Sequence, residues 1–480
     1  MTGPGEVPRR VAAPWLALLV AGGLAPVAAS APTGEPQVVA PPVERVVPQD
    51  PALDPAAPPP PDPAVLATSL APLLADDALG PSPAVSVRDL ATGAELAQRD
   101  STTPVEPAST AKIVTAAAAL DVLGADWRLV TRVGWVPATE RGGDRPALVL
   151  VGGGDLLLAP GAGDPGTVDG RVGLGDLARS AVLAVLEGDP GERLLAPDAA
   201  GVDVLVDDSL LGAPQQLLRS PGDAFFAATP ASLAVSAGRL GAGAGRDDDP
   251  AGTAALAFAD AVEDELARVL GADAPAVGSP VVTTRPVALP VVVAEARSAP
   301  LADVLSYLLV TSDNTIADSV AGLVAAEQGR STTLASASDT IVEVVEARGV
   351  DLGATDLTDG SGLSDDSVAT AAGLTALLAA AAAAPDEDDL RLLPHLLPVA
   401  GLEGTLDDRF GVDSAAAAGR GVVRAKTGTL TGTTALAGVV TAADGRGLAF
   451  AVLTDEVPAG STAAARRAVD RVAAAVAACC

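Results

Sequence analysis

The sequence predicts a mixed α/β (α+β) fold in which helices flank an antiparallel sheet and a large β-rich region is inserted. Three β-like runs follow one another near the C-terminus, and Asp444-Gly445 marks a tight turn after the second. An amphipathic helix pattern over 461–478 closes the chain, and a second strong helix pattern, 109–124, ends at a glycine. The three runs span 421–430, 434–445 and 448–456.

The N-terminus is typical of an export signal, which we assign to residues 1–31. Arg9 and Arg10 supply a positive start, an apolar stretch follows, and small residues at 29–31 end it. An uncleaved membrane anchor is the alternative. Residues 32–63 are rich in proline and lack apolar periodicity, so we predict an extended linker rather than folded structure.

The remaining chain is expected to form one catalytic domain whose sequence is interrupted by an inserted region. Residues 64–127 and 291–478 carry the clear helix and strand patterns and are assigned to the catalytic domain. Residues 128–290 show short β-like runs between Gly-rich breaks and are assigned to one or more inserted domains. The chain is long enough for two or three such units.

Within these parts, four further elements are predicted. Residues 64–80 have helical spacing, and 84–100 form a hairpin that turns at Ala91-Thr92-Gly93. Residues 300–310 and 315–329 form two helices with a short polar loop between them.

The composition excludes several classes of function. A net charge of -31 opposes nucleic-acid binding, because phosphates would be repelled. The chain has a single histidine, His395, and two cysteines, both at the C-terminus, so no metal cluster is expected. His395 lies in an apolar stretch, which favours packing over a role as the base of a Ser-His-Asp triad. We therefore expect no metal and no cofactor.

Lysine usage is the most informative feature of the composition. Of the 30 basic residues only Lys112 and Lys426 are lysines. Arginine cannot replace lysine where an amine must lose its proton or act as a compact charge. A codon-biased chain with two stray lysines is the alternative, and the neighbours of both residues argue against it.

Ser109 and Lys112 are separated by the spacing of one helical turn. If a helix begins at Ser109, the two side chains share a face, and the hydroxyl lies at the positive end of the helix. A buried lysine amine near a second cation loses its proton more easily and can act as a base. Lys426 is the candidate for that cation. The alternative is that Ser109 only caps the helix.

Two more short motifs complete the pattern. Ser312-Asp313-Asn314 falls in the loop between two helices, where a hydroxyl and a carboxamide can point into one cleft, although such triplets are also ordinary turn residues. Lys426-Thr427-Gly428-Thr429 ends a predicted strand. Lys426 offers a charge, Thr427 and Thr429 offer hydroxyls, and Gly428 lets a substrate backbone approach.

In this order, S-x-x-K, S-x-N and K-T-G resemble the signature of the penicillin-recognising serine enzymes. The resemblance implies a penicillin-binding/β-lactamase-like transpeptidase fold. The stretch from Ser109 to Ser312 is nearly twice as long as that from Ser312 to Lys426. In this respect the chain is similar to DacB-type D-alanyl-D-alanine carboxypeptidase/endopeptidases (class C low-molecular-mass penicillin-binding proteins), which carry extra domains between the first two motifs. Segments 150–155 and 358–364 also look like family segments.

The resemblance implies an acyl-enzyme mechanism. Ser109 attacks the carbonyl between two D-amino acids and Lys112 takes its proton. Ser312, in contact with Lys426, hands a proton to the leaving amine. The backbone N–H groups of Ser109 and Thr429 form the oxyanion hole.

The resemblance also implies the ligands. Lys426, Thr427 and Thr429 would hold a terminal carboxylate, and Asn314 the peptide carbonyl. Peptidoglycan peptides are the expected substrates and β-lactams the expected covalent inhibitors, outside the cytoplasm. The balance of carboxypeptidase and endopeptidase action and the oligomeric state stay open.

One segment departs from the family pattern, and two other functions compete. Asp365, Asp366 and Ser367 stand where a basic residue and an Asn are expected. The enzyme alternative is a β-lactamase or an SxxK esterase, which the motif spacing opposes. The non-enzyme alternative is a catalytically silent wall-binding protein, which the complete motifs oppose.

Overall fold

The structure is a computed structural model that describes residues 58–142, 144–188, 201–212, 225–241 and 245–479. The chain divides into two units, Met1–Pro48 and Gln49–Cys480, and all described residues belong to the second. The expected export signal and all but the end of the linker therefore lie outside the described residues. Within the described part of the chain, no helix has both the length and the apolar character needed to cross a bilayer.

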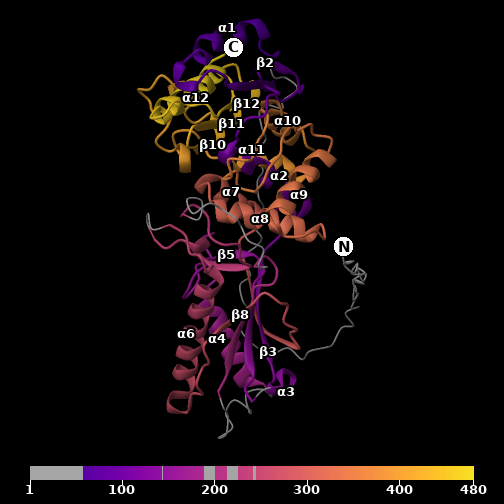
Figure 1. Cartoon of the computed structure of the whole chain (residues 1–480), viewed down its shortest axis with the longest axis vertical. Helices are drawn as coiled ribbons and strands as arrows, with labels where there is room; N and C mark the ends of the chain where they lie inside the picture. Colours follow the sequence, from indigo (N-terminus) through magenta and orange to yellow (C-terminus); the bar gives the residue numbers. More distant parts are fainter. Residues whose placement is uncertain (1–57, 143, 189–200, 213–224, 242–244, 480) are drawn as a thin grey trace, which may run out of the picture. The chain divides into compact units, whose positions relative to one another are not determined.

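The described chain contains an antiparallel five-stranded sheet, in which the first strand of the described chain pairs with the last (Figure 1). The strand order β10-β11-β12-β1-β2 confirms both the predicted hairpin and the three consecutive strands near the C-terminus. The strands are β1 (Ala84–Asp89), β2 (Glu95–Arg99), β10 (Val423–Leu430), β11 (Thr433–Thr441) and β12 (Gly447–Thr454).

Helices cover both faces of this sheet. Successive side chains of a strand point to opposite faces, so each strand contributes to the packing on both sides. Val85 and Val87 on β1 share a hydrophobic core with the helices α1 (Pro63–Leu74) and α12 (Thr462–Ala477). Ser86, between the two valines, instead contacts Thr375 of α10 (Ala371–Ala382) on the other face, with 2.8 Å between the hydroxyls. The predicted flanking of the sheet by helices is therefore confirmed.

A layer of helices lies next to the sheet and carries the middle of the catalytic region (Figure 1). The two helices predicted around the polar loop are present as α7 and α8, and Ser312-Asp313 separates them. The helices of this layer are α2 (Lys112–Val122), α7 (Leu301–Thr311), α8 (Asn314–Glu327), α9 (Leu334–Ala347), α10 (Ala371–Ala382) and the short α11 (Leu393–Leu396).

The inserted region contains a second five-stranded sheet among the described residues, with order β8-β6-β4-β3-β9. The sheet is mixed, since β4, β6 and β8 are parallel and β3 is antiparallel to both its neighbours. The strands are β3 (Val130–Val136), β4 (Ala147–Val151), β6 (Asp203–Asp207), β8 (Val281–Thr283) and β9 (Val291–Arg297).

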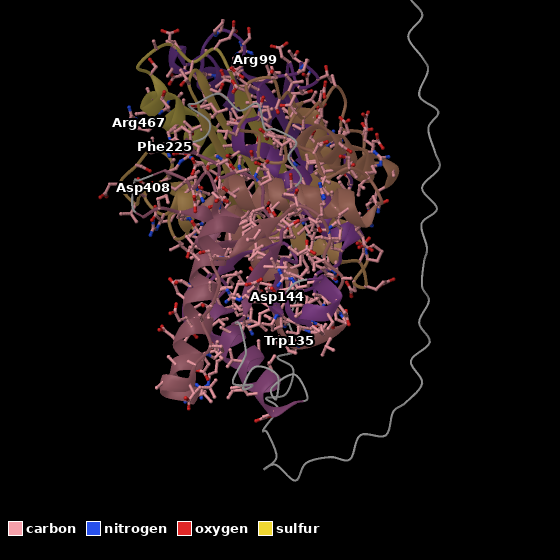
Figure 2. All side chains as sticks on the ribbon, turned by 60° about the horizontal axis from the view of Figure 1, so that its bottom comes forward. Arg99, Trp135, Asp144, Phe225, Asp408 and Arg467 are labelled. Carbon is pink, nitrogen blue, oxygen red and sulfur yellow. The ribbon has the colours of Figure 1, made fainter. Side chains whose placement is uncertain are left out.

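Two long helices, α4 (Leu174–Glu187) and α6 (Pro250–Leu270), lie side by side against this sheet (Figure 1). Their apolar faces share one core with Trp135 of β3 and Phe258 of α6. Trp135 belongs to the inserted region, as Figure 2 shows. The short α3 (Ala138–Arg141) follows β3.

The boundaries of the inserted region can be placed from strand pairing. β3 begins at Val130, and β9, which ends at Arg297, pairs with it from Val130 to Trp135. We therefore propose that the insertion ends after Arg297 rather than at residue 290. A separate short pair of parallel strands, β5 (Asp155–Leu158) and β7 (Leu233–Val235), also belongs to this region.

Candidate active site

Ser109 lies in a tight 3₁₀ turn, Ala108–Ala111, that leads directly into α2. The sequence predicted a regular helix from Ser109, whereas the α-helix itself begins at Lys112. Ala108 has a φ of 45°, a left-handed conformation that non-glycine residues rarely adopt. The hydroxyl of Thr110 donates to the carbonyl of Pro107 at 2.7 Å and closes the turn.

The amine of Lys112 is fully buried and contacts three oxygens. Its Nζ lies 2.8 Å from Ser109 Oγ, 2.7 Å from Asn314 Oδ1 and 2.6 Å from the carbonyl oxygen of Ser361. A protonated amine can donate to all three oxygens. A neutral amine can keep two of these bonds and accept the Ser109 proton on its lone pair. The geometry therefore suits proton transfer between Ser109 and Lys112.

The carbonyl of Ser361 is a contact that the sequence did not single out, although its segment was noted. The loop from Asp359 to Ser364 folds around the buried Asp359 carboxylate, which accepts four backbone N–H bonds. Gly362 packs so closely on the Ser109 turn that a Cβ there would lie 2.0 Å from the Ala108 carbonyl oxygen. This loop therefore fixes both the turn and the lysine.

The residues that follow this loop are those that depart from the family pattern. Asp365 and Asp366 are exposed, and Ser367 is buried. The Ser367 hydroxyl accepts the Thr358 N–H at 3.1 Å. Ser367 therefore has a local structural contact, and the two carboxylates face solvent.

Ser312 and Asn314 reach the same site from the loop between α7 and α8. Ser312 ends α7 in a left-handed conformation, with φ 57° and ψ 35°. Asp313 caps α8 by accepting the Ile316 N–H at 3.1 Å. Asn314 accepts from Lys112 through Oδ1 and donates through Nδ2 to the carbonyl of Phe226 at 3.2 Å. Phe226 belongs to the inserted region.

Lys426 is the second fully buried lysine, and it lies on β10. Its Nζ donates to the Thr427 carbonyl at 2.9 Å. Burial, then the charge of Lys112 and then that of Arg409, lower the pKa of the Lys426 amine well below its usual value. The sequence led us to expect that Lys426 lowers the pKa of Lys112; the effect seen here is that of the Lys112 charge on the pKa of Lys426. A second cation beside a buried amine favours loss of a proton from that amine.

The rest of the K-T-G-T segment continues along β10. Thr427 Oγ1 donates to Thr405 Oγ1 at 2.9 Å, and Thr429 Oγ1 donates to the Gly428 carbonyl at 2.7 Å. A Cβ at Gly428 would lie 2.7 Å from the Pro107 carbonyl oxygen. Gly428 therefore allows β10 to pack against the turn that carries Ser109, in addition to the substrate approach expected from the sequence.

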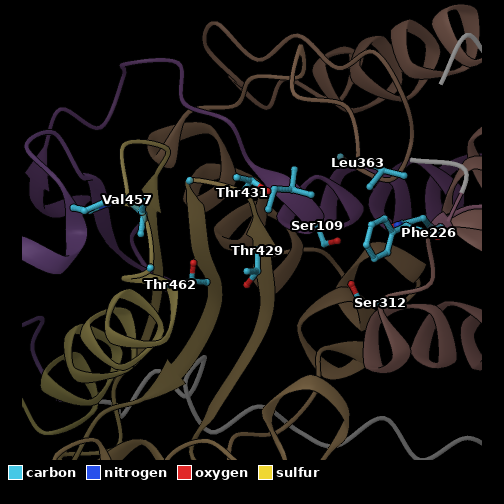
Figure 3. Close-up of a pocket in the computed structure, with 15 residues that line it drawn as sticks. Ser109, Phe226, Ser312, Leu363, Thr429, Thr431, Val457 and Thr462 are labelled. Carbon is cyan, nitrogen blue, oxygen red and sulfur yellow. The ribbon is translucent and has the colours of Figure 1, made fainter. Parts of the chain in front are cut away.

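One cavity of about 500 Å³ is lined by four of the motif residues, Ser109, Ser312, Asn314 and Thr429 (Figure 3). Figure 3 shows Ser109, Ser312 and Thr429 around it, with the ring of Phe226 beside them. Lys112 is buried behind two of its lining residues, Ser109 and Asn314, whose side chains it contacts. The lining residues are Ser109, Phe226, Ser312, Asn314, Gly362, Leu363, Thr429, Leu430, Thr431, Gly432, Val457, Pro458, Ala459, Gly460 and Thr462.

Within the described chain, the lining of this cavity contains neither a carboxylate nor His395. The described residues also contain no group of three or more His, Cys, Asp or Glu side chains placed to hold a metal ion. The chemistry available in the cavity is that of hydroxyls, an amide, backbone groups and the two buried amines. This combination is that of a serine hydrolase of the penicillin-binding class.

Comparison with known proteins gives the family. The model of the D-Ala-D-Ala carboxypeptidase 3 (S13) family matches residues 66–241 and 245–476. The chain therefore belongs to this family and is a serine D-Ala-D-Ala carboxypeptidase. The resemblance predicted from the three motifs is confirmed.

The names of similar proteins agree with this assignment. Carboxypeptidase DacB of Mycolicibacterium smegmatis is 35% identical over 429 residues, which cover 86% of this chain and 84% of the relative. A D-alanyl-D-alanine carboxypeptidase of Actinomadura sp. is 31% identical over 444 residues, 80% of this chain and 79% of the relative. The crystal structure of penicillin-binding protein 4 from Haemophilus influenzae has a TM-score of 0.62 at 20% identity and covers 85% of this chain and 98% of that one. This similarity confirms the predicted fold class.

Proposed function

We propose that Ser109 is the nucleophile of this carboxypeptidase and Lys112 its general base. The observation that carries the proposal is the 2.8 Å contact between Lys112 Nζ and Ser109 Oγ in a buried setting. Ser109 Oγ attacks the carbonyl carbon of the penultimate D-Ala, and its proton passes to Lys112. The charge that develops on the carbonyl oxygen would be bound by the backbone N–H groups of Ser109 and Thr429. Donors of this kind are worth roughly 100- to 1000-fold in rate.

The leaving group needs a proton, and Ser312 is proposed to supply it. Ser312 lines the cavity beside Ser109, and its hydroxyl can relay a proton from the lysine pair to the departing amine. The C–N bond then breaks, D-alanine leaves, and the acyl group stays on Ser109. Water hydrolyses this ester and restores the enzyme.

The remaining residues of the motifs are proposed to hold the substrate. Thr427 and Thr429 would bind the terminal carboxylate by hydrogen bonds. The positive charge of Lys426, which is buried on β10, would attract the same carboxylate. Asn314 would orient the peptide carbonyl through its amide, which the structure already fixes between Lys112 and Phe226.

The substrates are proposed to be peptidoglycan stem peptides. The support is the family and the open cavity, which has room for a peptide. Membership of this family implies action outside the cytoplasm, and we propose that the N-terminal segment is a cleaved export signal followed by a spacer. Mature protein beginning near Ala31 or Pro32 would support this, and full-length protein confined to the cytoplasm would oppose it.

β-Lactams are proposed to acylate Ser109, and the resulting ester is proposed to be hydrolysed slowly. A rapid β-lactamase places a general base beside the ester, and no carboxylate lines the cavity among the described residues. We therefore expect the penicilloyl-enzyme to persist for minutes or longer, measured by timed recovery of activity. Turnover of many penicillins per second, with no D-alanine released from any peptide, would favour the β-lactamase alternative.

The test of the proposed function uses purified protein and defined muropeptides, with products identified by mass spectrometry. Loss of D-alanine from pentapeptides is the carboxypeptidase result, and cleavage of cross-linked dimers would add endopeptidase action. Ser109→Ala should abolish both, whereas Ser69→Ala, an exposed serine on α1, should change neither. Unchanged D-alanine release by Ser109→Ala would reject the proposed nucleophile.

A further inference from the structure

The middle residue of the S-x-N motif has contacts of its own. The Asp313 side chain is only 1% exposed. Its Oδ2 accepts from Arg239 Nη2 and from Arg246 Nη2, each at 2.7 Å, while its Oδ1 accepts the Ile316 N–H. Both arginines belong to the inserted region. The carboxylate between Ser312 and Asn314 is therefore held by a part of the chain outside the catalytic helices and sheet.

The two arginines are themselves fixed in place. Arg239 Nη1 lies 3.1 Å from Asp169 Oδ2, which also accepts the Tyr307 hydroxyl at 2.9 Å. The guanidinium carbon of Arg239 lies 5.7 Å from the centre of the Tyr307 ring. Arg246 Nη1 donates to the Ala237 carbonyl at 2.9 Å. The negative charges of Asp313 and Asp169 thus balance the positive charges of the two arginines.

The same segment of the inserted region contacts the two residues after Asp313. The Phe226 carbonyl accepts from Asn314 Nδ2 at 3.2 Å. The Ala228 N–H donates to Thr315 Oγ1 at 2.9 Å. Three consecutive residues, 313 to 315, are each bound by residues between 226 and 246. This is a series of directed polar contacts rather than a general apolar interface.

The loop needs such support because its conformation is unfavourable. Ser312 has a left-handed backbone, which costs energy for a residue with a Cβ and persists only when the surroundings enforce it. The side chain of Ser312 lines the cavity in this conformation. A buried ion pair is a weak source of stability, since desolvation offsets much of its attraction. The contacts to Asp313 are therefore better explained by a role in fixing the conformation of this loop than by their contribution to stability alone.

We propose that Arg239 and Arg246, acting through Asp313, are positioning residues that hold Ser312 and Asn314 in their catalytic places. The inserted region is then a working part of the active site and not only an appended domain. The inference rests on the roles proposed above for Ser312 and Asn314. A displacement of a reacting group by about 1 Å can lower the rate roughly 100-fold.

The test compares Arg246→Met, Arg239→Met and the double variant with a matched control in the same region. Arg141→Met is that control, because Arg141 makes a similar contact to Asp203 at 2.8 Å but lies on α3, away from the loop. Acylation by a fluorescent penicillin is followed by stopped flow, so that the rate at saturation separates from initial binding. D-Alanine release from a pentapeptide gives kcat and KM, and thermal melting monitors the fold.

The proposal predicts that the double variant acylates roughly 10- to 100-fold more slowly at saturation, with kcat lowered more than KM. Arg246→Lys, which keeps one donor to Asp313, should recover part of the rate. Arg141→Met should stay within about twofold of wild type, as for a partly exposed ion pair. A rate that falls only in proportion to the unfolded fraction, or that falls equally in Arg141→Met, overturns the proposal.

Two further variants keep the test decisive. Asp313→Asn retains the Oδ1 acceptor for α8 but removes the charge that the arginines bind, so it serves if the double arginine variant does not fold. It should lower the acylation rate without a matching loss of melting temperature. Ser312→Ala separates the two proposals. If Ser312→Ala is impaired and the arginine and Asp313 variants are not, only the positioning role fails; if Ser312→Ala is unimpaired, the proposed function of Ser312 fails.

Discussion

Among the described residues, the last strand of each five-stranded sheet is buried to a very different degree: β12 lies at the centre of its sheet, and β9 lies at the edge of its own. Every residue of β12 in the catalytic sheet is buried, whereas none of the seven residues of β9 in the inserted sheet is. Two layers of helices enclose the first sheet, so it can hold the Lys426 amine away from water. The second sheet has an exposed edge, and the polar contacts described above to residues 313–315 come from residues 226–246, outside its strands. We infer that dense packing positions the groups proposed to react and that the inserted region adjusts one loop among them.

The largest effect should come from the Ser109 turn itself. Ser109→Ala and Lys112→Arg should each lower acylation by about 10⁴-fold or more, because one removes the nucleophile and the other a group that can accept its proton. Acylation by fluorescent penicillin measures this, with melting curves to verify folding. Near-wild-type acylation by Lys112→Arg would reject Lys112 as the base.

A smaller but clear effect is expected where the catalytic sheet meets that turn. Gly428→Ala places a Cβ 2.7 Å from the Pro107 carbonyl oxygen, so β10 and the Ser109 turn must separate. We expect acylation to fall roughly 10- to 100-fold and stability to fall by about 1–3 kcal/mol. Gly411→Ala is the control, since no atom lies within 4 Å of its added Cβ. Equal behaviour of the two variants would show that the close contact does not matter.

Much of this arrangement could be predicted from the sequence. The two lysines, the spacing of Ser109 and Lys112, and the alternation of the last strands depend on local patterns, and these predicted the family and the fold. The contacts of Asp313 could not be predicted. Arg239 and Arg246 are far from it in sequence, and nothing local distinguishes them from the other arginines. The 3₁₀ turn at Ser109 was missed because it depends on packing against Gly362 and Gly428.

The inserted region should show its own dependence on pH. Burial raises the pKa of Asp155 and of Asp208 from 3.8 to about 6. Between about pH 4 and 6 the folded state then binds more protons than the unfolded state, so stability from these groups is lost as the pH rises. Lowering the pH from 7.5 to 5.5 should add roughly 1 kcal/mol for each group.

Urea unfolding at the two pH values tests this expectation. Asp155→Asn keeps an acceptor for the Leu157 N–H and should flatten the pH dependence. A midpoint that falls on acidification, or a slope that Asp155→Asn leaves unchanged, would contradict the assignment to this carboxyl.

The smallest effect is expected at the exposed edge of the inserted sheet. Arg132 on β3 and Glu295 on β9 lie 3.0 Å apart, with 43% and 32% of their side chains exposed. Arg132→Ala should change stability by less than about 1 kcal/mol and should leave acylation unchanged, because solvent screens the pair. Thermal melting and the acylation assay measure both. A loss of acylation as large as that in the Arg239 and Arg246 variants would mean that any disturbance of the insertion affects the site.

The central claim is that Ser109, beside the buried amine of Lys112, forms the acyl-enzyme in this cavity. Its most direct measurement is the mass of the protein after reaction with penicillin, followed by mapping of the modified peptide. The account predicts a single adduct on the peptide that contains Ser109 and none in Ser109→Ala. An adduct on another residue, or an unchanged adduct in Ser109→Ala, would contradict it.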